Sequence, residues 1–421
     1  MDPHGCETRT SKEGHQRTLQ ALDQSDRYTL PTYSRPDIII ERGKGAFLFD
    51  TEGRSYLDFT AGIAVTALGH ADATVAQVLY DQATKLVHIS NAFHNENAGK
   101  LAQKIITTTR QHGGDWAYQL FFSNSGTEAN EGALKFARKW GKHIQGNDKY
   151  EVVCFTNAFH GRSMGALSAT FNPKYREPFS PLVPGFVRVP FNDTEQATRA
   201  ITEKTCAVII EPIQGEGGIH AASAEFLKAL RSRCNEKKAL LIFDEIQCGL
   251  GRTGKLWAHQ HYGQHCQPDM LTMAKPLANG IPIGAVMTNA KVADMLVIGD
   301  HGTTFGGNPL ATAAALSVFE RISEPAFLDT VTVSGALLKD GLMSLKEQYP
   351  DIIQQVRGQG LLLGLQFSKD PAPLVKIARK HGLLILTGAG NTVRIVPPLN
   401  IKPKELCLGL EKLGKALQQF L

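Results

Sequence analysis

The stretch Leu240-Leu-Ile-Phe-Asp-Glu-Ile-Gln247 decides the fold class, because an uninterrupted apolar run ends on two carboxylates. Continuous apolar runs of this length are typical of strands that are covered on both faces within a parallel sheet. Such a strand delivers Asp244 at its C-terminal end. An isolated aspartate at that position can equally cap the following turn, so its role depends on the rest of the chain.

Similar apolar runs recur along the chain, and helical or loop stretches separate them. They lie at residues 119–122, 151–155, 207–210 and 270–274. This alternation predicts an α/β fold, in which a mostly parallel central sheet carries helices on both faces. A ligand of such a sheet binds at the carboxyl ends of the strands.

Lys275 closes the apolar run that starts at Asp269, and Pro276 follows it. Proline disfavours helical geometry in the preceding residue, so Lys275 is expected to project from a strand end or a turn. Desolvation lowers the pKa of a buried amine, as a Schiff-base lysine requires. A lysine considered alone is better explained as a surface residue. Together with a buried Asp244, however, it indicates pyridoxal 5'-phosphate, whose pyridine nitrogen a carboxylate keeps protonated.

The run Gln119-Leu-Phe-Phe122 leads into Ser123-Asn-Ser-Gly-Thr-Glu128 and then into a helical pattern of apolar residues. Ser125, Gly126 and Thr127 therefore lie at a helix N-terminus, where free amides and hydroxyls suit a phosphate dianion. A triplet of this kind is more often an ordinary helix cap. It matches neither the P-loop nor the GxGxxG fingerprint.

Seven segments, in the same order, resemble the class III (ornithine-type) aminotransferases within fold type I of the pyridoxal-phosphate enzymes. The resemblance extends from about Tyr33 to the C-terminus, and the acetylornithine-type enzymes resemble the chain most. The segments are Tyr56–His70, Asn124–Asn130, Phe159–Arg162, Glu211–Glu216, Asp244–Gln247, Lys275 and His301–Pro309.

The resemblance implies roles for residues around the cofactor. Lys275 binds the cofactor covalently and moves the substrate proton, while Asp244 holds the pyridinium. Phe159 and Ile246 sandwich the ring. Thr304 reaches the phosphate in a partner subunit, which implies a homodimer with shared active sites. The full set of cofactor contacts is Ser125, Gly126, Thr127, Phe159, Asp244, Glu245, Ile246, Gln247, Lys275 and Thr304.

The resemblance also implies substrate contacts. Arg162 clamps a substrate carboxylate distal to the reacting amine, because a guanidinium binds carboxylate in bidentate fashion and keeps its charge. Glu216 and Arg394 form a switch pair, in which Glu216 masks Arg394 until the α-carboxylate of glutamate or 2-oxoglutarate binds. Ile63 stands where ornithine enzymes carry a tyrosine, and Thr303 stands where acetylornithine enzymes usually carry a serine. Taken alone, Arg394 can also be a solvated strand residue.

The expected reaction transfers the terminal amine of N2-acetylornithine to 2-oxoglutarate, giving N-acetylglutamate 5-semialdehyde and glutamate, as in arginine biosynthesis. An apolar Ile63 fits an acylated amine better than a charged ammonium. The alternatives are 4-aminobutyrate, ornithine or a specialised-metabolism amine. Ala92 and His94 depart from the family pattern, which indicates either an altered side-chain pocket or neutral drift.

Two other classes of protein fit less well. A decarboxylase or racemase has no use for a switch pair, because it does not alternate between two substrates. A catalytically silent relative is expected to lose Lys275 or Asp244, and both are present.

Composition limits the remaining function classes. The 421 residues are 42% hydrophobic, and Lys plus Arg exceed Asp plus Glu by only 45 − 40 = 5. No dense basic run or bilayer-length apolar stretch occurs, so neither nucleic acid nor membrane is an expected partner. The seven cysteines lack CxxC spacing, which argues against a disulfide framework and a zinc site, and no metal is expected.

The chain is expected to divide into an arm, a large domain and a small α+β domain built from both ends of the sequence. Residues 1–27 are expected to be a flexible arm, 28–68 the N-terminal part of the small domain, 69–321 the large cofactor-binding domain and 322–421 the C-terminal small domain. The acidic residues near the N-terminus are unlike a mitochondrial transit peptide and favour a cytoplasmic protein. Family resemblance gives the mitochondrial matrix as the alternative.

Overall fold

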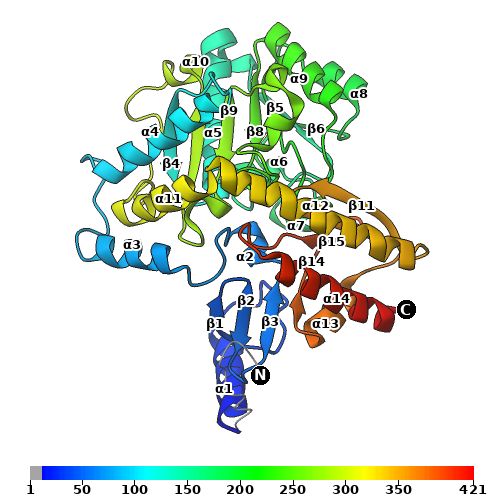
Figure 1. Ribbon diagram of the computed structural model, residues 1–421. Helices are drawn as coiled ribbons and strands as arrows, with labels where there is room; N and C mark the ends of the chain where they lie inside the picture. The colour runs from blue at the N-terminus through cyan, green and yellow to red at the C-terminus, as the bar shows by residue number, and fades with distance from the viewer. Residues whose placement is uncertain (1–11) are drawn as a thin grey trace.

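A computed structural model describes residues 12–421 of the chain. Its centre is a seven-stranded sheet (Figure 1). The strands, in spatial order, are β4 (Gln119–Ser123), β10 (Gly284–Thr288), β9 (Met270–Met273), β8 (Leu240–Asp244), β7 (Thr205–Ile210), β5 (Glu151–Phe155) and β6 (Phe186–Val189). All neighbouring pairs are parallel except those that β10 makes with β4 and β9. The predicted α/β fold with a mostly parallel sheet is therefore confirmed.

Alternation along β8 explains why this strand is buried on both faces. Leu240 and Ile242 pack with α5 (Gly126–Gln145) in one apolar cluster. Leu241 and Phe243 pack with α9 (Ala224–Lys237) in another. Successive side chains of a strand point to opposite faces, so a continuous apolar run is required when helices cover both.

The sequence-based reading missed β6 and β10. β6 is a short strand at the sheet edge with a charged Arg188 in its middle. β10 begins at Gly284 and runs against its neighbours, and it follows β9 through the short helix η5 (Lys275–Ala278) rather than through a crossover helix.

Two four-stranded sheets lie beside the large one (Figure 1). The first contains β1 (Ile40–Lys44), β2 (Phe47–Asp50), β3 (Ser55–Asp58) and β13 (Leu383–Leu384). The second contains β11 (Ile353–Gln359), β12 (Leu362–Phe367), β15 (Thr392–Ile395) and β14 (Leu386–Gly388). Because β13 pairs with β3, the two ends of the chain meet in one sheet.

The long helices connect these layers. Helices outside the large sheet's crossovers include α3 (Ala73–Ala83), α4 (Glu96–Gln111), α11 (Pro309–Ile322), α12 (Pro325–Gln348), α13 (Ala372–Lys380) and α14 (Pro403–Phe420). α11 packs on α3, α4 and η5, whereas α12 packs on β11 and α14. On this basis we propose domain boundaries near residues 69 and 321.

Within the segment 1–27, which was expected to be a flexible arm, residues 12–27 belong to helix α1 (Lys12–Tyr28). Thr18 is buried at 3% exposure, and its hydroxyl lies 2.6 Å from the hydroxyl of Thr51. Gly14 packs so closely on the backbone of Thr51 that a Cβ would lie 2.5 Å from the carbonyl oxygen. This anchoring is a tertiary contact that a polar composition does not reveal. Residues 1–11 lie outside the described part of the chain.

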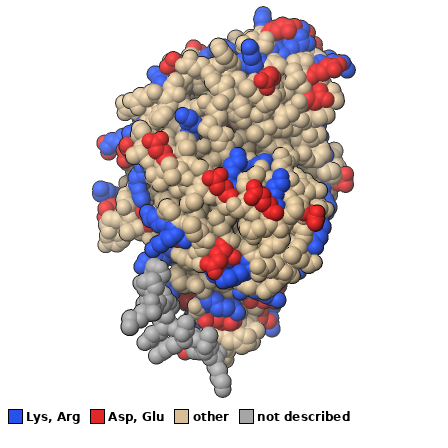
Figure 2. All heavy atoms as spheres, turned by 45° about the vertical axis from the view of Figure 1, so that its right-hand side comes forward, with Lys and Arg blue, Asp and Glu red and all other residues tan. Residues whose placement is uncertain are grey.

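Other features of residues 12–421 concern partners. No helix in this part of the chain is long and apolar enough to cross a membrane. No group of three or more His, Cys, Asp or Glu side chains within it is arranged to hold a metal ion. On the face shown in Figure 2, basic and acidic side chains are interspersed.

Candidate active site

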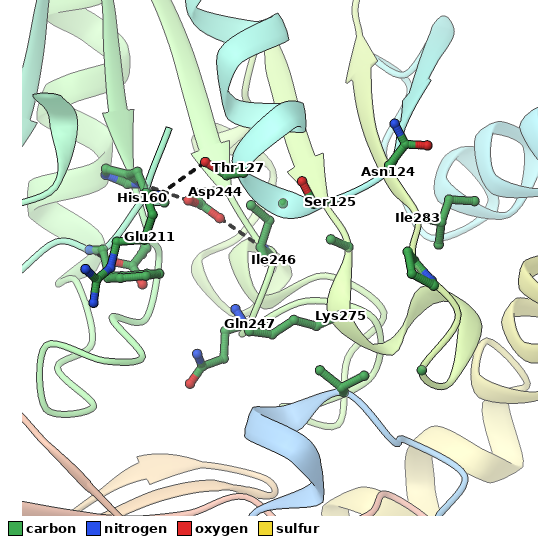
Figure 3. Close-up of a pocket in the computed structure, with 18 of the residues that line it drawn as sticks. Asn124, Ser125, Thr127, His160, Glu211, Asp244, Ile246, Gln247, Lys275 and Ile283 are labelled. Atoms are coloured by element: carbon green, nitrogen blue, oxygen red, sulfur yellow. Dashed lines mark hydrogen bonds and ion pairs between the residues drawn. The ribbon is translucent and has the colours of Figure 1, made fainter. Parts of the chain in front are cut away.

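A cavity of about 350 Å³ lies at the carboxyl ends of β8 and β9, beside the N-terminus of α5 (Figure 3). Nine of the predicted site residues line it. They are Ser125, Gly126, Thr127, Phe159, Arg162, Asp244, Ile246, Gln247 and Lys275. The edge of the sheet on which the sequence placed the ligand is thus the edge that carries the cavity.

Asp244, at the end of β8, is fixed by a buried hydrogen-bond network. Its Oδ2 accepts from Asn130 Nδ2 at 2.8 Å and from His160 Nδ1 at 2.7 Å, and its Oδ1 accepts from the Ile246 amide at 3.1 Å. The Asn130 amide is held in turn by the Thr272 hydroxyl, which donates to its Oδ1 at 2.8 Å. We call Asp244, Asn130, His160 and Thr272 the sheet end of the cavity. Here one carboxylate has a single well-defined position.

The sequence-based reading missed the partners of Asp244. Asn130 lies on the buried face of α5 among alanines, and it is fully buried. A polar side chain within an apolar helical stripe is a signal that a partner exists, because an unpaired buried amide is costly. The sequence does not say which partner.

Glu211 is a second buried acid beside this network. Its oxygens accept from the backbone amides of Phe159 and Gly215, each at 3.1 Å. Burial is the main cause that raises the pKa of Glu211 to about 7; His160 acts against this shift and Asp244 adds to it. Glu211 therefore holds a proton close to neutral pH.

Lys275 directly follows β9 and opens η5, as predicted for a residue at a strand end or turn. Figure 3 shows its side chain extending across the cavity toward the side where Gln247 lies. Burial lowers the pKa of the Lys275 amine, and the charge of Asp244 opposes that shift. A lysine in this setting has an enlarged neutral fraction, which a nucleophile or general base requires.

Asn279 anchors the loop that carries Lys275. Its Oδ1 accepts from the Leu68 amide at 2.8 Å, and its Nδ2 donates to the Gly69 carbonyl at 3.0 Å. Asn279 has φ +50°, a backbone conformation that asparagine tolerates better than most residues. This contact between residues far apart in sequence was not predicted.

The N-terminus of α5 forms another wall. Ser125 caps the helix by accepting from the Glu128 amide at 3.3 Å. Gly126 approaches Ile246 so closely that a Cβ would lie 2.9 Å from its methyl carbons, so a larger residue there would require the Ile246 side chain to shift. The Thr127 hydroxyl accepts from the amides of Arg162 and Ser163 at 3.2 and 3.1 Å. The free first-turn amides suit an anion, while Thr127 also holds the loop that carries Arg162.

Glu245, predicted among the cofactor-binding residues, does not line the cavity. Its carboxylate is fully buried and accepts from the amides of Ala258 and His259 at 2.5 and 2.9 Å. It also accepts from His259 Nδ1 at 2.6 Å. Neighbouring residues of an extended chain point in opposite directions, so the cavity-facing Asp244 sends Glu245 to the other side.

Ile63 lies outside the cavity lining, on a turn with left-handed backbone conformation. Ala61, Ile63 and Ala64 have φ of 44°, 66° and 62°. Left-handed conformation costs about 1–2 kcal/mol for a residue with a Cβ. Asp58 offsets part of this cost, since its Oδ1 accepts from the amides of Thr60 and Ala61 at 2.8 and 3.1 Å. The turn leaves Ile63 47% exposed.

Thr303 and Thr304 belong to a loop beside the cavity. The Thr303 hydroxyl accepts from Asn124 Nδ2 at 3.1 Å and from the Gly306 amide at 3.2 Å. Asn91, in turn, donates to the Thr303 carbonyl at 2.9 Å. Thr304 is exposed. Within this subunit Thr303 therefore fixes its own loop against cavity-lining Asn124.

The two remaining predicted residues, Glu216 and Arg394, lie near Arg162 and an unpredicted Tyr175. The Arg162 guanidinium carbon lies 3.5 Å from the centroid of the Tyr175 ring, and the Tyr175 hydroxyl donates to Glu216 Oε1 at 3.0 Å. Arg394 Nη1 donates to Gln247 Oε1 at 3.3 Å. We call Arg162, Tyr175, Glu216 and Arg394 the loop end of the cavity. Two guanidinium groups at one end suit carboxylate ligands.

Arg394 is nearly buried, at 5% exposure, yet within residues 12–421 it forms no ion pair. Burial lowers the pKa of Arg394, and the charge of Glu216 opposes the shift. A buried guanidinium without an ion-pair partner favours an incoming carboxylate. The prediction that Arg394 is a substrate contact is consistent with this position.

The sequence of the chain matches one family of known proteins over most of its length. The family model described as aminotransferase class-III matches residues 29–417. A mitochondrial acetylornithine aminotransferase of Yarrowia lipolytica is 52% identical over 398 residues, which cover 94% of this chain and 95% of the relative. Its counterpart in Debaryomyces hansenii is 50% identical over 397 residues, covering 93% and 85%.

Solved structures agree with this result. The crystal structure of ornithine aminotransferase from Toxoplasma gondii ME49 superposes with a TM-score of 0.89 at 33% identity, covering 96% of this chain and 95% of that one. The N-acetylornithine aminotransferase of Stenotrophomonas maltophilia K279a gives a TM-score of 0.80 at 36% identity, covering 95% and 99%. Fold and sequence thus point to the same group of proteins.

Proposed function

The chain belongs to the class III aminotransferases, and we propose that it transfers the terminal amine of N2-acetylornithine to 2-oxoglutarate, giving N-acetylglutamate 5-semialdehyde and glutamate. The observation that carries this proposal is the placement of two arginines, Arg162 and Arg394, beside one cavity that contains Lys275. The two substrates carry their α-carboxylates at different distances from the reacting amine. An enzyme that accepts both in turn needs two carboxylate sites.

Pyridoxal 5'-phosphate is the cofactor, and the cavity fits it. A buried carboxylate at Asp244, an amine at Lys275 and a helix N-terminus at Gly126 supply partners for its ring nitrogen, its aldehyde and its phosphate. Phe159 and Ile246 line the cavity as an aromatic and a branched aliphatic wall. When bound, the cofactor acts as an electron sink for the electrons left on the substrate carbon that loses a proton.

The chain's own residues divide the work. Lys275 accepts the proton from the amine-bearing carbon and returns it, because desolvation increases the neutral fraction of its amine. Asp244, fixed by its hydrogen bonds to Asn130 and His160, would hold the ring nitrogen of the cofactor. Arg162 orients acetylornithine through its carboxylate, and Arg394 orients glutamate.

The active site is proposed to be completed by a second copy of the chain. Thr304 lies exposed next to Phe305, which is 59% exposed, and His88 packs on the Phe305 ring at 5.3 Å. The neighbouring Val87 and Phe93 are 50% and 66% exposed. An apolar patch of this kind beside a cavity is typical of a dimer interface.

We also propose a mitochondrial location. The relatives from Yarrowia lipolytica and Debaryomyces hansenii are both named as mitochondrial proteins. The preference for the cytoplasm rested on composition within the first 26 residues, of which 1–11 lie outside the described part of the chain. The names of the relatives favour the alternative that family resemblance gave.

A scan of single half-reactions tests the proposed donor. Cofactor-loaded protein is mixed separately with N2-acetylornithine, ornithine, 4-aminobutyrate and glutamate while the cofactor absorbance is followed. Rapid conversion by acetylornithine and glutamate, with ornithine slow, is expected. If glutamate converts the cofactor and acetylornithine does not, the aminotransferase mechanism stands and the proposed donor is wrong.

A further inference from the structure

Tyr175 lies between two charged residues of the loop end, Arg162 and Glu216. It lies on the short helix α7 (Pro173–Arg176), which Asn172 caps by accepting from the Lys174 amide at 3.1 Å. One face of its ring carries the Arg162 guanidinium at 3.5 Å, and its hydroxyl donates to Glu216 at 3.0 Å. Phe159 packs edge-on against the ring at 6.2 Å.

The hydroxyl of Tyr175 is a stable donor. Burial raises the pKa of Tyr175, and the negative charge of Glu216 raises it further. The hydroxyl therefore keeps its proton throughout the neutral range and can hydrogen-bond to a carboxylate.

Glu216 has a hydrogen-bonded backbone, and its side chain lies near both Tyr175 and Arg394. Its carbonyl oxygen accepts from the Ala389 amide at 2.8 Å, which ties this residue to the loop before β15. Its carboxylate bonds to Tyr175, while the charge of Glu216 still acts on the nearby Arg394. A Cβ on Gly388 would lie 3.1 Å from the Glu216 carbonyl oxygen and 3.3 Å from Arg394 Cδ, so Glu216 and Arg394 are close neighbours on either side of Gly388.

We propose that Tyr175 is the alternative partner of Glu216, which holds this carboxylate away from Arg394 while glutamate or 2-oxoglutarate is bound. The inference rests on the proposed function, because only an enzyme with two alternating substrates needs a released Arg394. Glu216 accepts from Tyr175, and among residues 12–421 the side chain of Arg394 donates two long hydrogen bonds, to Gln247 and to the Thr387 carbonyl, each at 3.3 Å. Tyr175 is thus a positioning residue, acting on substrate choice through Glu216.

The proposal predicts a split between the two half-reactions. Without the hydroxyl, Glu216 pairs with Arg394 for more of the time. The fraction of enzyme with a free Arg394 therefore falls, and the apparent affinity for glutamate falls with it. The loss of one hydrogen bond to a charged group corresponds to about a 10-fold change. The acetylornithine half-reaction does not use Arg394, and its rate is expected to stay within about twofold.

Tyr175→Phe tests this directly, because it keeps the ring under Arg162 and removes only the hydroxyl. KM for glutamate and for 2-oxoglutarate is expected to rise about 10-fold, with the acetylornithine half-reaction unchanged. Tyr175→Leu also removes the stacking surface, so both half-reactions are expected to weaken. Equal changes in both half-reactions of Tyr175→Phe, or no change in either, overturn the proposal.

A second variant separates a switch effect from general damage to the fold. In a Glu216→Gln background the carboxylate is gone, so adding Tyr175→Phe is expected to change the glutamate KM by less than about twofold. A full 10-fold effect in that background shows that Tyr175 acts without Glu216 and contradicts the proposal. If wild-type protein does not react with acetylornithine, the proposed donor is wrong, while the glutamate measurements still test Tyr175.

Discussion

The sheet end and the loop end of the cavity are built differently. At the sheet end, Asp244 receives hydrogen bonds of 2.7 and 2.8 Å from His160 and Asn130, and all three side chains are buried. At the loop end, Arg394 has contacts of 3.3 Å, and Gln247 is one of its partners. The first arrangement holds one ligand in one place. The second leaves a charged group available to a ligand that comes and goes.

The difference follows from the elements that supply the side chains. Asp244 and Asn130 stand on β8 and α5, which pack in the centre of the large sheet. Tyr175 stands on a four-residue helix, and Glu216 lies in a loop. Rigid elements give precise placement, whereas loops permit exchange between partners. Chemistry common to both substrates thus rests mainly on β8, β9 and α5, whereas substrate choice combines Arg394 on β15 with Tyr175 on a short helix and Glu216 in a loop.

Removal of the amine is expected to have the largest effect. Lys275→Ala loses the group that moves the proton, so both half-reactions are expected to slow by at least about 10⁴-fold. Lys255, which is exposed, provides a matched control, and Lys255→Ala is expected to remain within about twofold of wild type. Rapid mixing with each substrate gives both rates. Retention of more than about 1% of the rate in Lys275→Ala contradicts the role of this residue.

Asp244→Asn is expected to slow both half-reactions by about 100-fold or more, because it removes a charge that both reactions use. Asn130→Ala weakens the same carboxylate indirectly and is expected to cost about 10-fold, again equally. Steady-state and single-turnover rates with acetylornithine and with glutamate measure this. Unequal losses in the two half-reactions mean that the sheet end also takes part in substrate choice.

The buried acid beside the sheet end is expected to make stability depend on pH. The pKa of Glu211 is about 7 in the folded protein and near its ordinary value of 4.5 when unfolded. The folded state therefore holds a proton that the unfolded state loses, so this group's contribution to stability falls as pH rises from about 4.5 to 7. The full decrease is up to about 3 kcal/mol.

Glu211→Gln removes this titration. Carboxylates with a lowered pKa, such as Asp72 and Asp269, act in the opposite direction and are common to both proteins, so only the difference between variant and wild type is informative. The loss in thermal midpoint between pH 5 and pH 8 is expected to be smaller in the variant. Equal losses in the two proteins contradict a raised pKa at Glu211.

The smallest effect is expected at the left-handed turn. Ile63→Gly removes the backbone strain of a β-branched residue at φ +66°. This gain offsets the conformational entropy that glycine adds to the unfolded chain. The free energy of unfolding is therefore expected to stay within about 1 kcal/mol of the wild-type value. Ile40→Gly in strand β1, where a comparable side chain is 39% exposed, is expected to destabilise by about 1 kcal/mol. Thermal unfolding of both variants compares them. A larger loss in Ile63→Gly than in Ile40→Gly contradicts strain at the turn.

At the sheet end only Asp244 was predictable, because its signal is local, whereas its partners Asn130, His160 and Thr272 were missed. The apolar runs before Asp244 and Lys275 predict buried strands, and a buried charge at a strand end requires a partner. The large sheet followed from the same signal, apart from the short edge strand β6 and from β10, whose reversed direction cannot be read from composition. The family resemblance then supplied a cofactor for these residues.

The loop end was predictable only in part. Arg162 and Arg394 were predicted through family resemblance. The contact between Tyr175 and Glu216 was not, because 41 residues separate the two in sequence and no local pattern near Tyr175 indicates it. The side chain of Glu245 lies away from the cavity, because adjacency to Asp244 does not determine which side a residue faces. The left-handed conformation of Ile63 could not be predicted from the sequence, because β-branched residues rarely adopt positive φ.

The decisive measurement is the ratio of kcat/KM for N2-acetylornithine to that for glutamate in two variants, Asp244→Asn and Arg394→Lys. A lysine at 394 keeps the charge and loses bidentate binding, so the ratio is expected to rise at least about 10-fold. In Asp244→Asn both values fall together, and the ratio is expected to stay within about twofold of wild type. If the ratio changes equally in both variants, the division between a sheet end for shared chemistry and a loop end for substrate choice is wrong.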